Sequence, residues 1–448
     1  MNFIPIVLFS CFLLLANPGT AAAYLDPSAG NALVYIAVTL AGVLAYAAKG
    51  VFYRLVKLWN GKGGEGGAAA RSDGIALFSE GKNYWNTFET VVKALIARGQ
   101  PFSYYTMDME DPGLKINNPL MRSQYIGEGS AAYARLNRVA CRVMLATTPN
   151  IGTPGYHLPR PAKVEFLFHV FHGSEGVSSY KKGALDCYDG VGMVGSYAAP
   201  ALRYLEEKRG LPAKELVPLG LPYWDGMLQQ AEAYQAKLGE APRPERRTLL
   251  LAPSWSEKGF LSHYDTGFIK SLASEFNLIL RPHPQSWISE PGLLNRVKKE
   301  LEGTPNITWD EASDPAPSLA ASDLLISDTS GVRMDYAVIY KKPVVSLEVK
   351  VEDVSSFERA ELPAEYVDSL ADKVCVPIRA EEIGNINAIV RAALAGQGAL
   401  DLDAFVRENI ANLGTAGEHV ADYLIQKCVA LSEATAKENV KEGVEHVV

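Results

Sequence analysis

Two histidines stand just after short apolar runs, the position at which an open α/β sheet presents its functional side chains. His172 comes two residues after the run VEFLFHV, and His283 lies in the RPHP motif Arg281–Pro284, directly after the run LIL. Histidine titrates near neutral pH and is the usual proton-transfer side chain, while arginine suits a phosphate group. We therefore predict a catalytic role for His172, with loop capping as the alternative. We predict phosphate binding by Arg281 and His283, with a plain exposed turn as the alternative.

A third candidate site combines hydroxyl groups with a glycine, directly after the apolar run Leu324–Ser327. It consists of Asp328–Gly331 (Asp-Thr-Ser-Gly), where a helix is expected to begin. The free N–H groups of a helix start and the hydroxyls of Ser and Thr bind phosphate oxygens, but the same residues are also ordinary helix caps. The local pattern leaves both interpretations open. A fourth segment, Leu219–Asp225, is by itself typical of a turn with a packed aromatic side chain.

Several other motifs carry little weight. Gly190–Gly195 spells GxGxxG but looks like a glycine-rich strand itself, and Asp401–Asp403 is typical of a solvated helix start. His169 faces the opposite side of a strand from His172, so the two cannot form one metal site, and we expect His169 in the core. The sequence contains no GxxxxGK(S/T), HExxH or GxSxG. P-loop kinases, zinc proteases and α/β-hydrolases therefore lose their main support.

The elements that must position these side chains alternate between short apolar runs and helical stretches, which is typical of an open α/β sheet. The polar, proline-containing stretch 229–247 predicts a domain boundary. We expect an N-terminal α/β domain at 75–235, a C-terminal one at 246–430 and a polar tail at 431–448. Strands are expected at 74–78, 164–170, 248–252, 278–280, 324–327 and 343–347, and helices at 84–97 and 197–209.

Composition indicates an ordinary globular protein of two or three domains, with 448 residues of which 48% are hydrophobic and 21% charged. Collagen-like, coiled-coil and wholly disordered chains are excluded. The net charge of −8, from 43 basic and 51 acidic residues, argues against broad nucleic-acid binding. The five cysteines are scattered without a CxxC, which fits a reducing compartment.

The N-terminal region carries two apolar runs, from which we predict a membrane tether. Residues 1–23 are similar to a signal peptide, with a lipoprotein signal at Cys11 as the alternative. Residues 24–59 contain a second run, at the lower edge of spanning length, followed by basic residues. The positive-inside rule then places the catalytic body on the cytoplasmic side of the cell (inner) membrane, after a glycine-rich linker at 60–74. A buried hairpin of core helices is the alternative for the second run.

Taken in order, these motifs resemble the CDP-glycerol glycerophosphotransferase family, the membrane-associated enzymes of teichoic-acid synthesis. The resemblance runs over about residues 165–425 and covers little of the chain before that. Each motif is weak alone, and the ordered set is fairly specific. The motifs are the HG pair His172-Gly173, a GxPxxD-like turn (Gly220, Pro222, Asp225), the LAPSW sequence Leu251–Trp255, the RPHP motif, SDLLISDTSG with Asp335 downstream, and Lys342-Pro343.

The resemblance implies an α/β, GT-B-like fold, in which two Rossmann-like domains face a cleft and a membrane segment precedes them. By position, His172 would be the base that takes the proton of the acceptor hydroxyl. His283, as a second catalytic residue, would steady the pyrophosphate of the donor together with Arg281. The remaining donor-binding residues would be Pro253, Ser254, Asp328, Thr329, Ser330, Gly331 and Asp335, with Gly173, Gly220 and Asp225 in secondary positions.

The implied function is transfer of glycerol phosphate, or a similar polyol phosphate, from a CDP-activated donor to a hydroxyl of a membrane-lipid-linked acceptor. The reaction would release CMP in cell-envelope polymer synthesis, with no metal, no cofactor and no nucleic-acid partner. Thr329 and Gly331 depart from the SDYSS loop of the family, which leaves glycerol, ribitol or a sugar open as the transferred group. The alternatives are a GT-B glycosyltransferase that uses a nucleotide-sugar and a non-catalytic, glycan-binding relative.

Overall fold

The computed structural model describes the body of the chain and leaves the N-terminal region undescribed. The predicted signal peptide (1–23), the predicted transmembrane segment (24–59) and all but the last two residues of the predicted linker (60–74) lie outside the described residues. Within the described part, no helix combines the length and the apolar character that a membrane span requires. The described residues are 73–445, apart from Glu175, 240–243, 257–258, Ser313, 351–353, 368–369 and Ala399.

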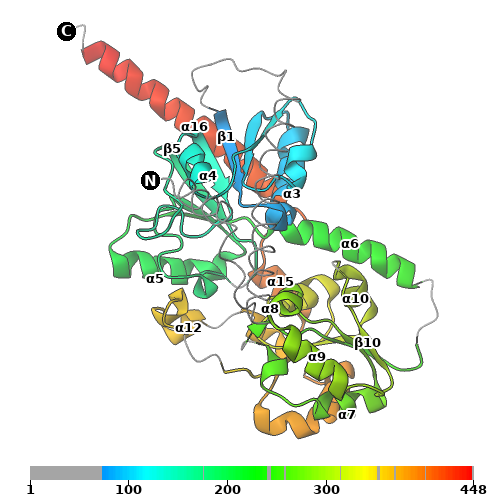
Figure 1. Cartoon of the computed structure of the whole chain (residues 1–448). Helices are drawn as coiled ribbons and strands as arrows, with labels where there is room; N and C mark the ends of the chain where they lie inside the picture. The colour runs from blue at the N-terminus through cyan, green and yellow to red at the C-terminus, as the bar shows by residue number, and fades with distance from the viewer. Residues whose placement is uncertain are drawn as a thin grey trace, which may run out of the picture. The chain divides into compact units, whose positions relative to one another are not determined.

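Seven parallel strands form the first sheet, in the order β3-β2-β1-β4-β5-β6-β7. The order reverses between β1 and β4, and open α/β sheets bind ligands outside the carboxyl ends of the strands at such a switch point. We call this sheet and its helices the first half of the body (Figure 1). The strands are β1 (Asp73–Ser79), β2 (Phe102–Thr106), β3 (Met121–Tyr125), β4 (Ala140–Ala146), β5 (Lys163–Val170), β6 (Gly190–Met193) and β7 (Glu215–Pro218).

Six parallel strands form the second sheet, in the order β10-β9-β8-β11-β12-β13. Its switch point lies between β8 and β11. This sheet and its helices are the second half, so the chain has two doubly wound α/β sheets, each with one ligand-binding edge. The strands are β8 (Thr248–Leu251), β9 (Asn277–Leu280), β10 (Ile307–Trp309), β11 (Leu324–Ser327), β12 (Val344–Leu347) and β13 (Cys375–Ile378).

Helices separate most of these strands. The first half contains α3 (Trp85–Ala97), α4 (Gly129–Leu136), α5 (Ala199–Arg209), α6 (Pro222–Gly239) and, from the end of the chain, α16 (Ala416–Glu445). The second half contains α7 (Gly267–Glu275), α8 (Pro284–Ser289), α9 (Pro291–Glu300), α10 (Ala316–Ala321), α11 (Val332–Asp335), α12 (Ala364–Val367), α13 (Leu370–Lys373), α14 (Ile386–Leu394) and α15 (Leu402–Asn409).

The apolar pattern explains why these segments take these forms. Every residue of β8 (TLLL) and β11 (LLIS) is buried, because parallel strands at the centre of a sheet are covered on both faces. In α3 the buried Phe88, Val91, Val92 and Leu95 recur at the spacing of one helix face, and that face covers the first sheet. One hydrophobic cluster therefore lies within each half, and a third cluster runs through both halves.

The last helix differs from the prediction. The sequence placed residues up to 430 in the second half and a polar tail at 431–448, whereas α16 contacts α3, α6 and β4 of the first half (Figure 1). Asp225, buried near the start of α6, accepts the backbone N–H groups of Ala416 at 3.1 Å and Gly417 at 2.7 Å. These bonds satisfy donors that the first turn of α16 would otherwise leave unpaired. The cap therefore holds the start of α16 against α6. It joins residues that are far apart in the sequence, so no local pattern predicts it.

The polar stretch 229–247 also differs from a simple linker. Its first part continues α6 as far as Gly239, and α6 contacts α3 of the first half and α10 of the second. One helix therefore connects the two halves.

Candidate active site

His172 lies beyond the carboxyl end of β5, beside the end of β4. Its Nδ1 is 3.2 Å from the hydroxyl of Thr147, and its ring contacts Tyr84 edge-on and stacks on Tyr180. Partial burial lowers the pKa of His172, and a backbone hydrogen bond with Thr147 raises it by less. A lowered pKa means that the imidazole is neutral at neutral pH. His172 is therefore in the form that can accept a proton.

His169 belongs to the core, as the sequence predicts. It is fully buried on β5, and its Nε2 is 3.2 Å from the hydroxyl of Tyr180. Burial holds its pKa well below the usual value, so it is neutral. His169 thus supports Tyr180, which in turn stacks on His172.

His283 caps α8 in the second half. Its Nδ1 accepts the backbone N–H of Gln285 at 3.1 Å, and its exposed ring lies 6.4 Å, between centroids, from the ring of Trp255. Partial burial lowers the pKa of His283 as well. Because the cap uses Nδ1, the Nε2 atom is the one left to meet a ligand.

The structure does not bring Arg281 into the same cleft as His283. Its guanidinium donates to Asp310 at 2.6 Å and to the carbonyl of Ala312 at 2.7 Å, and only 10% of its side chain is exposed. Asp310 also accepts from Ser318, and its pKa is lowered because these hydrogen bonds and the arginine outweigh its desolvation. Arg281 therefore ties β9 to the loop after β10.

The Asp328–Gly331 loop follows β11 and leads into the helical run that begins at Val332. Asp328 is buried and accepts the backbone N–H groups of Ser254 at 3.1 Å and Phe260 at 2.7 Å. Its pKa is raised, because desolvation outweighs these bonds. Asp328 thus fastens the loop after β8, while the half-exposed Thr329 lies with its hydroxyl 3.4 Å from that of Ser254.

Two adjoining clefts open at these strand ends. The His283 cleft, of about 550 Å³, and the His172 cleft, of about 380 Å³, share Ser179 and Gly331 as lining residues. The two clefts therefore meet at these two residues. Of the predicted residues, Ser254, His283, Asp328, Thr329, Ser330 and Gly331 line the His283 cleft, and His172, Gly173, Gly331 and Asp335 line the His172 cleft.

Asp335 was predicted to bind the donor, but it lies on the His172 side. Its Oδ1 accepts the hydroxyl of Tyr223 and the indole N–H of Trp224, the latter at 2.7 Å. Both donors come from the start of α6, so Asp335 joins the first half to the second at the edge of the His172 cleft.

The remaining predicted residues support the fold around the clefts. Gly220 has φ of +87°, and an added Cβ would lie 2.3 Å from the carbonyl oxygen of Ala411, so this position requires glycine. Asp225 caps α16, as described above. Pro253 is buried and does not line either cleft. The GxPxxD-like turn therefore holds the C-terminal segment rather than a ligand.

Sequence reasoning missed several residues at the two clefts, of which five bear on the chemistry. Thr147 and Tyr180 position His172, while Arg333, Glu348 and Arg359 line the His283 cleft. Thr147 and Glu348 directly follow buried apolar strands, a signal that could have found them, whereas nothing in the sequence around Arg359 marks it.

In the part of the chain that the structure describes, no group of three or more His, Cys, Asp or Glu side chains is placed to hold a metal ion. The two other simple motifs have structural roles. The GxGxxG sequence is strand β6 with its flanking turn, and Asp401 of the DxD caps α15 by accepting the N–H of Ala404 at 2.9 Å.

Two parallel α/β sheets with ligand clefts at their carboxyl ends define a GT-B-like fold. The family model of CDP-glycerol:poly(glycerophosphate) glycerophosphotransferases matches residues 198–382, which include His283 and the Asp328–Gly331 loop but not His172. This match confirms the resemblance inferred from the sequence motifs. Over this stretch the chain is similar to that family, which makes it a CDP-glycerol glycerophosphotransferase-like enzyme. A comparison with curated proteins finds no match.

Solved structures share the fold at low sequence identity. A variant of the wall teichoic acid polymerase TagF soaked with CDPG has a TM-score of 0.51 and 16% identity, and the match covers 80% of this chain and 90% of that one. The UDP-GlcNAc 2-epimerase from Neisseria meningitidis, bound to UDP-GlcNAc, has a TM-score of 0.51 and 10% identity, with 79% and 99% covered. The Methanocaldococcus jannaschii UDP-GlcNAc 2-epimerase has a TM-score of 0.50 and 12% identity, with 79% and 99% covered.

Proposed function

We propose that the chain transfers glycerol phosphate, or a similar polyol phosphate, from a CDP-activated donor to a hydroxyl of a membrane-lipid-linked acceptor in cell-envelope polymer synthesis. The observation that carries the proposal is the pair of adjoining clefts. One contains a neutral histidine suited to a base, and the other contains the hydroxyl-rich loop inside the family match. The donor would occupy the His283 cleft and the acceptor the His172 cleft.

The proposed reaction is a displacement at phosphorus. The acceptor oxygen attacks the phosphorus that carries the polyol, and the bond from that phosphorus to the bridging oxygen breaks. CMP leaves with the electron pair, and His172 takes the proton of the hydroxyl. Phosphoryl transfer depends mainly on positioning and on neutralising charge. The His283 side chain and the hydroxyls of Thr329 and Ser330 are the donors placed for this task.

We further propose that residues 1–59 tether the enzyme to the cell membrane with its body on the cytoplasmic side. The support is the sequence pattern of two apolar runs followed by basic residues. Fractionation of cells that produce the full chain or a chain without residues 1–59 tests the tether. Recovery of the full chain in the supernatant would contradict it.

The reaction is tested by nucleotide release. The full-length chain is incubated with a lipid extract and with CDP-glycerol, CDP-ribitol, UDP-sugars or GDP-sugars. We expect CMP from a CDP-polyol, and we expect the His172→Ala variant to be about 10²–10⁴-fold slower, the usual contribution of a general base. His419→Ala, on the exposed side of α16, is the matched control and should keep the wild-type rate. Release of UDP or GDP without CMP would instead support a nucleotide-sugar transferase.

A further inference from the structure

The His283 cleft must hold a negatively charged donor, but three of its five Asp, Glu and Arg side chains already have hydrogen-bond or ion-pair partners. Its acidic members are Asp328, Glu348 and Asp372, and its arginines are Arg333 and Arg359. The donor of the proposed function carries about two negative charges on its diphosphate. A cation with free N–H groups is therefore needed to favour binding over repulsion.

Arg333 is not that cation. It is buried, and its guanidinium donates to Ser346 and Asp372, both at 2.9 Å, and to the carbonyl of Ser330 at 3.2 Å. These bonds hold the Arg333 guanidinium in the wall of the cleft, where it is already paired. Arg281 is likewise bound to Asp310, outside the cleft.

Arg359 differs from both. It is exposed, it lines the His283 cleft, and its side chain forms no hydrogen bond or ion pair with any residue that the structure describes. Its guanidinium can therefore give both N–H edges to a ligand. Arginine binds phosphate groups through two parallel hydrogen bonds, which suits a diphosphate.

Arg359 is also held in place from the first half. It lies in the short 3-10 turn η8 (Glu358–Ala360), within a segment at 354–362 that we call the strap. The backbone N–H of Glu358 donates to Tyr180 at 2.8 Å, and the carbonyl of Ser356 accepts the N–H of Lys182 at 3.0 Å. The strap is thus paired through its backbone with the loop that carries Tyr180, the residue stacked on His172.

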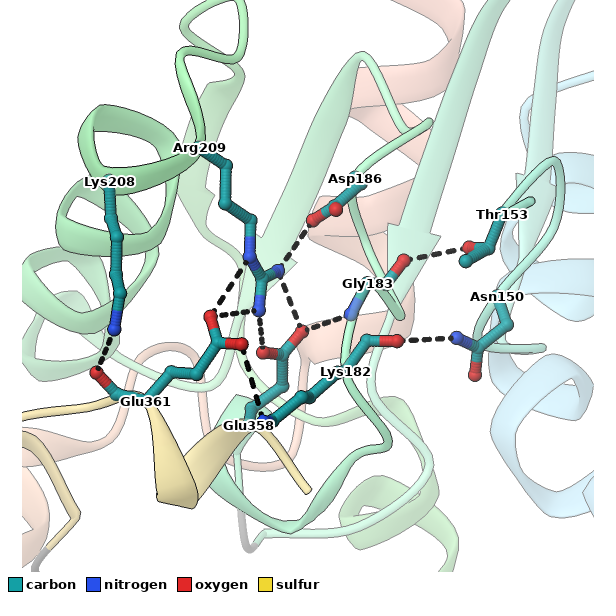
Figure 2. A network of polar contacts seen from close by, with 9 residues as sticks. All are labelled: Asn150, Thr153, Lys182, Gly183, Asp186, Lys208, Arg209, Glu358 and Glu361. Atoms are coloured by element: carbon teal, nitrogen blue, oxygen red, sulfur yellow. Dashed lines mark hydrogen bonds and ion pairs between the residues drawn. The ribbon is translucent and has the colours of Figure 1, made fainter. Parts of the chain in front are cut away.

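Side chains on either side of Arg359 reinforce this attachment. Figure 2 shows Arg209 of α5 reaching Glu358 and Glu361 of the strap as well as Asp186 of its own half. Only 1% of the Glu358 side chain is exposed, and its Oε1 accepts the N–H of Gly183 at 2.8 Å. Glu358 is therefore fastened to the first half, while the adjacent Arg359 faces the cleft.

We propose that Arg359 binds the diphosphate of the nucleotide donor, and that the strap, through Glu358 and Arg209, delivers this cation from the junction of the two halves. The inference rests on the proposed function, since it assigns a residue to the same donor site. It goes beyond that function by naming the cation and the contact that positions it. Arg359 is thus a donor-binding residue, and Glu358 a positioning residue.

Binding of CDP, UDP, GDP and cytidine to the full-length chain, measured by calorimetry, tests the inference. For whichever diphosphate the wild type binds best, we expect the dissociation constant of Arg359→Ala to rise about 10–100-fold, as for loss of a charge-assisted contact. Arg359→Lys should lose less, because the charge remains but the paired geometry does not. The affinity for cytidine should not change. Arg407→Ala is the matched control, an exposed arginine of α15 that lines neither cleft.

The outcomes separate the two proposals. If the wild type prefers UDP or GDP to CDP, the proposal of glycerophosphate transfer is contradicted. The role of Arg359 is then tested by comparing the wild type and Arg359→Ala with the preferred nucleotide. Unchanged diphosphate binding in Arg359→Ala overturns the role of Arg359, even where CMP release confirms the reaction. Equal losses for diphosphate and cytidine overturn it too, because a phosphate contact cannot weaken binding of a ligand without phosphate. A wild type that binds none of the three diphosphates also overturns it.

Discussion

The ion pair between Arg209 and Glu358 should contribute strongly to the stability of the body, because both side chains are largely withdrawn from water. Their exposed fractions are 16% and 1%. In Arg209→Met, the Glu358 carboxylate would stay buried and would keep only the N–H of Gly183 as a described partner. Breaking a buried pair in this way costs about 3–5 kcal/mol. We therefore expect the free energy of unfolding, measured with urea, to fall by about this amount.

Two further variants isolate the cause. Arg391→Met breaks the pair with Glu275, whose side chains are 55% and 38% exposed, and should cost less than about 1 kcal/mol. Arg209→Met combined with Glu358→Leu removes the stranded carboxylate, so the double variant should recover at least about 2 kcal/mol of the loss. If Arg209→Met costs no more than Arg391→Met, or if the double variant is worse than the single one, the assignment of a buried pair is wrong.

Two other results are expected. Because burial lowers the pKa of His172, kcat/KM should be constant above neutral pH and fall as pH drops through an apparent pKa below 6.5. This acid limb should disappear from the residual rate of His172→Ala and persist in His283→Ala, and the opposite pattern would assign the base to His283. Gly220→Ala, which combines a positive φ with a close carbonyl oxygen, should lower the thermal midpoint more than Gly210→Ala, where φ is +61° and no atom lies within 4 Å of the new Cβ. Equal shifts would mean that backbone strain alone matters at both positions.

The strands that the sequence revealed lie inside the two sheets, although β2 and the central strand β4 of the first sheet were missed. Thr248–Leu251 and Leu324–Ser327 are continuous apolar runs because both of their faces are covered. The edge strands were not predicted. β3 (MRSQY) and β10 (ITW) have few fully buried residues, since one side of an edge strand has no neighbour and the faces are less covered. Their sequences therefore resemble loops.

The structure places some of the predicted site residues at the clefts and others away from them. His172, His283 and Asp328–Gly331 lie at two adjoining clefts, because the carboxyl ends of parallel strands meet at one edge of each sheet. Arg281 also follows the end of a strand directly, but its ion pair with Asp310 holds the side chain outside the cleft. Spacing along the chain locates a strand end, and it does not reveal which partner a long side chain will reach.

The sequence by itself determined the class of fold and the positions of the histidines and the hydroxyl-rich loop. Those features are local, since apolar runs and the residues that follow them are neighbours in the chain. Only the tertiary structure decided which arginine faces the donor cleft, and that the GxPxxD-like turn caps α16. Arg359 lies 150 residues after Arg209, and Asp225 lies 191 residues before the Ala416 N–H that it accepts. Such long-range contacts depend on how the two sheets and the last helix pack, which no local pattern records.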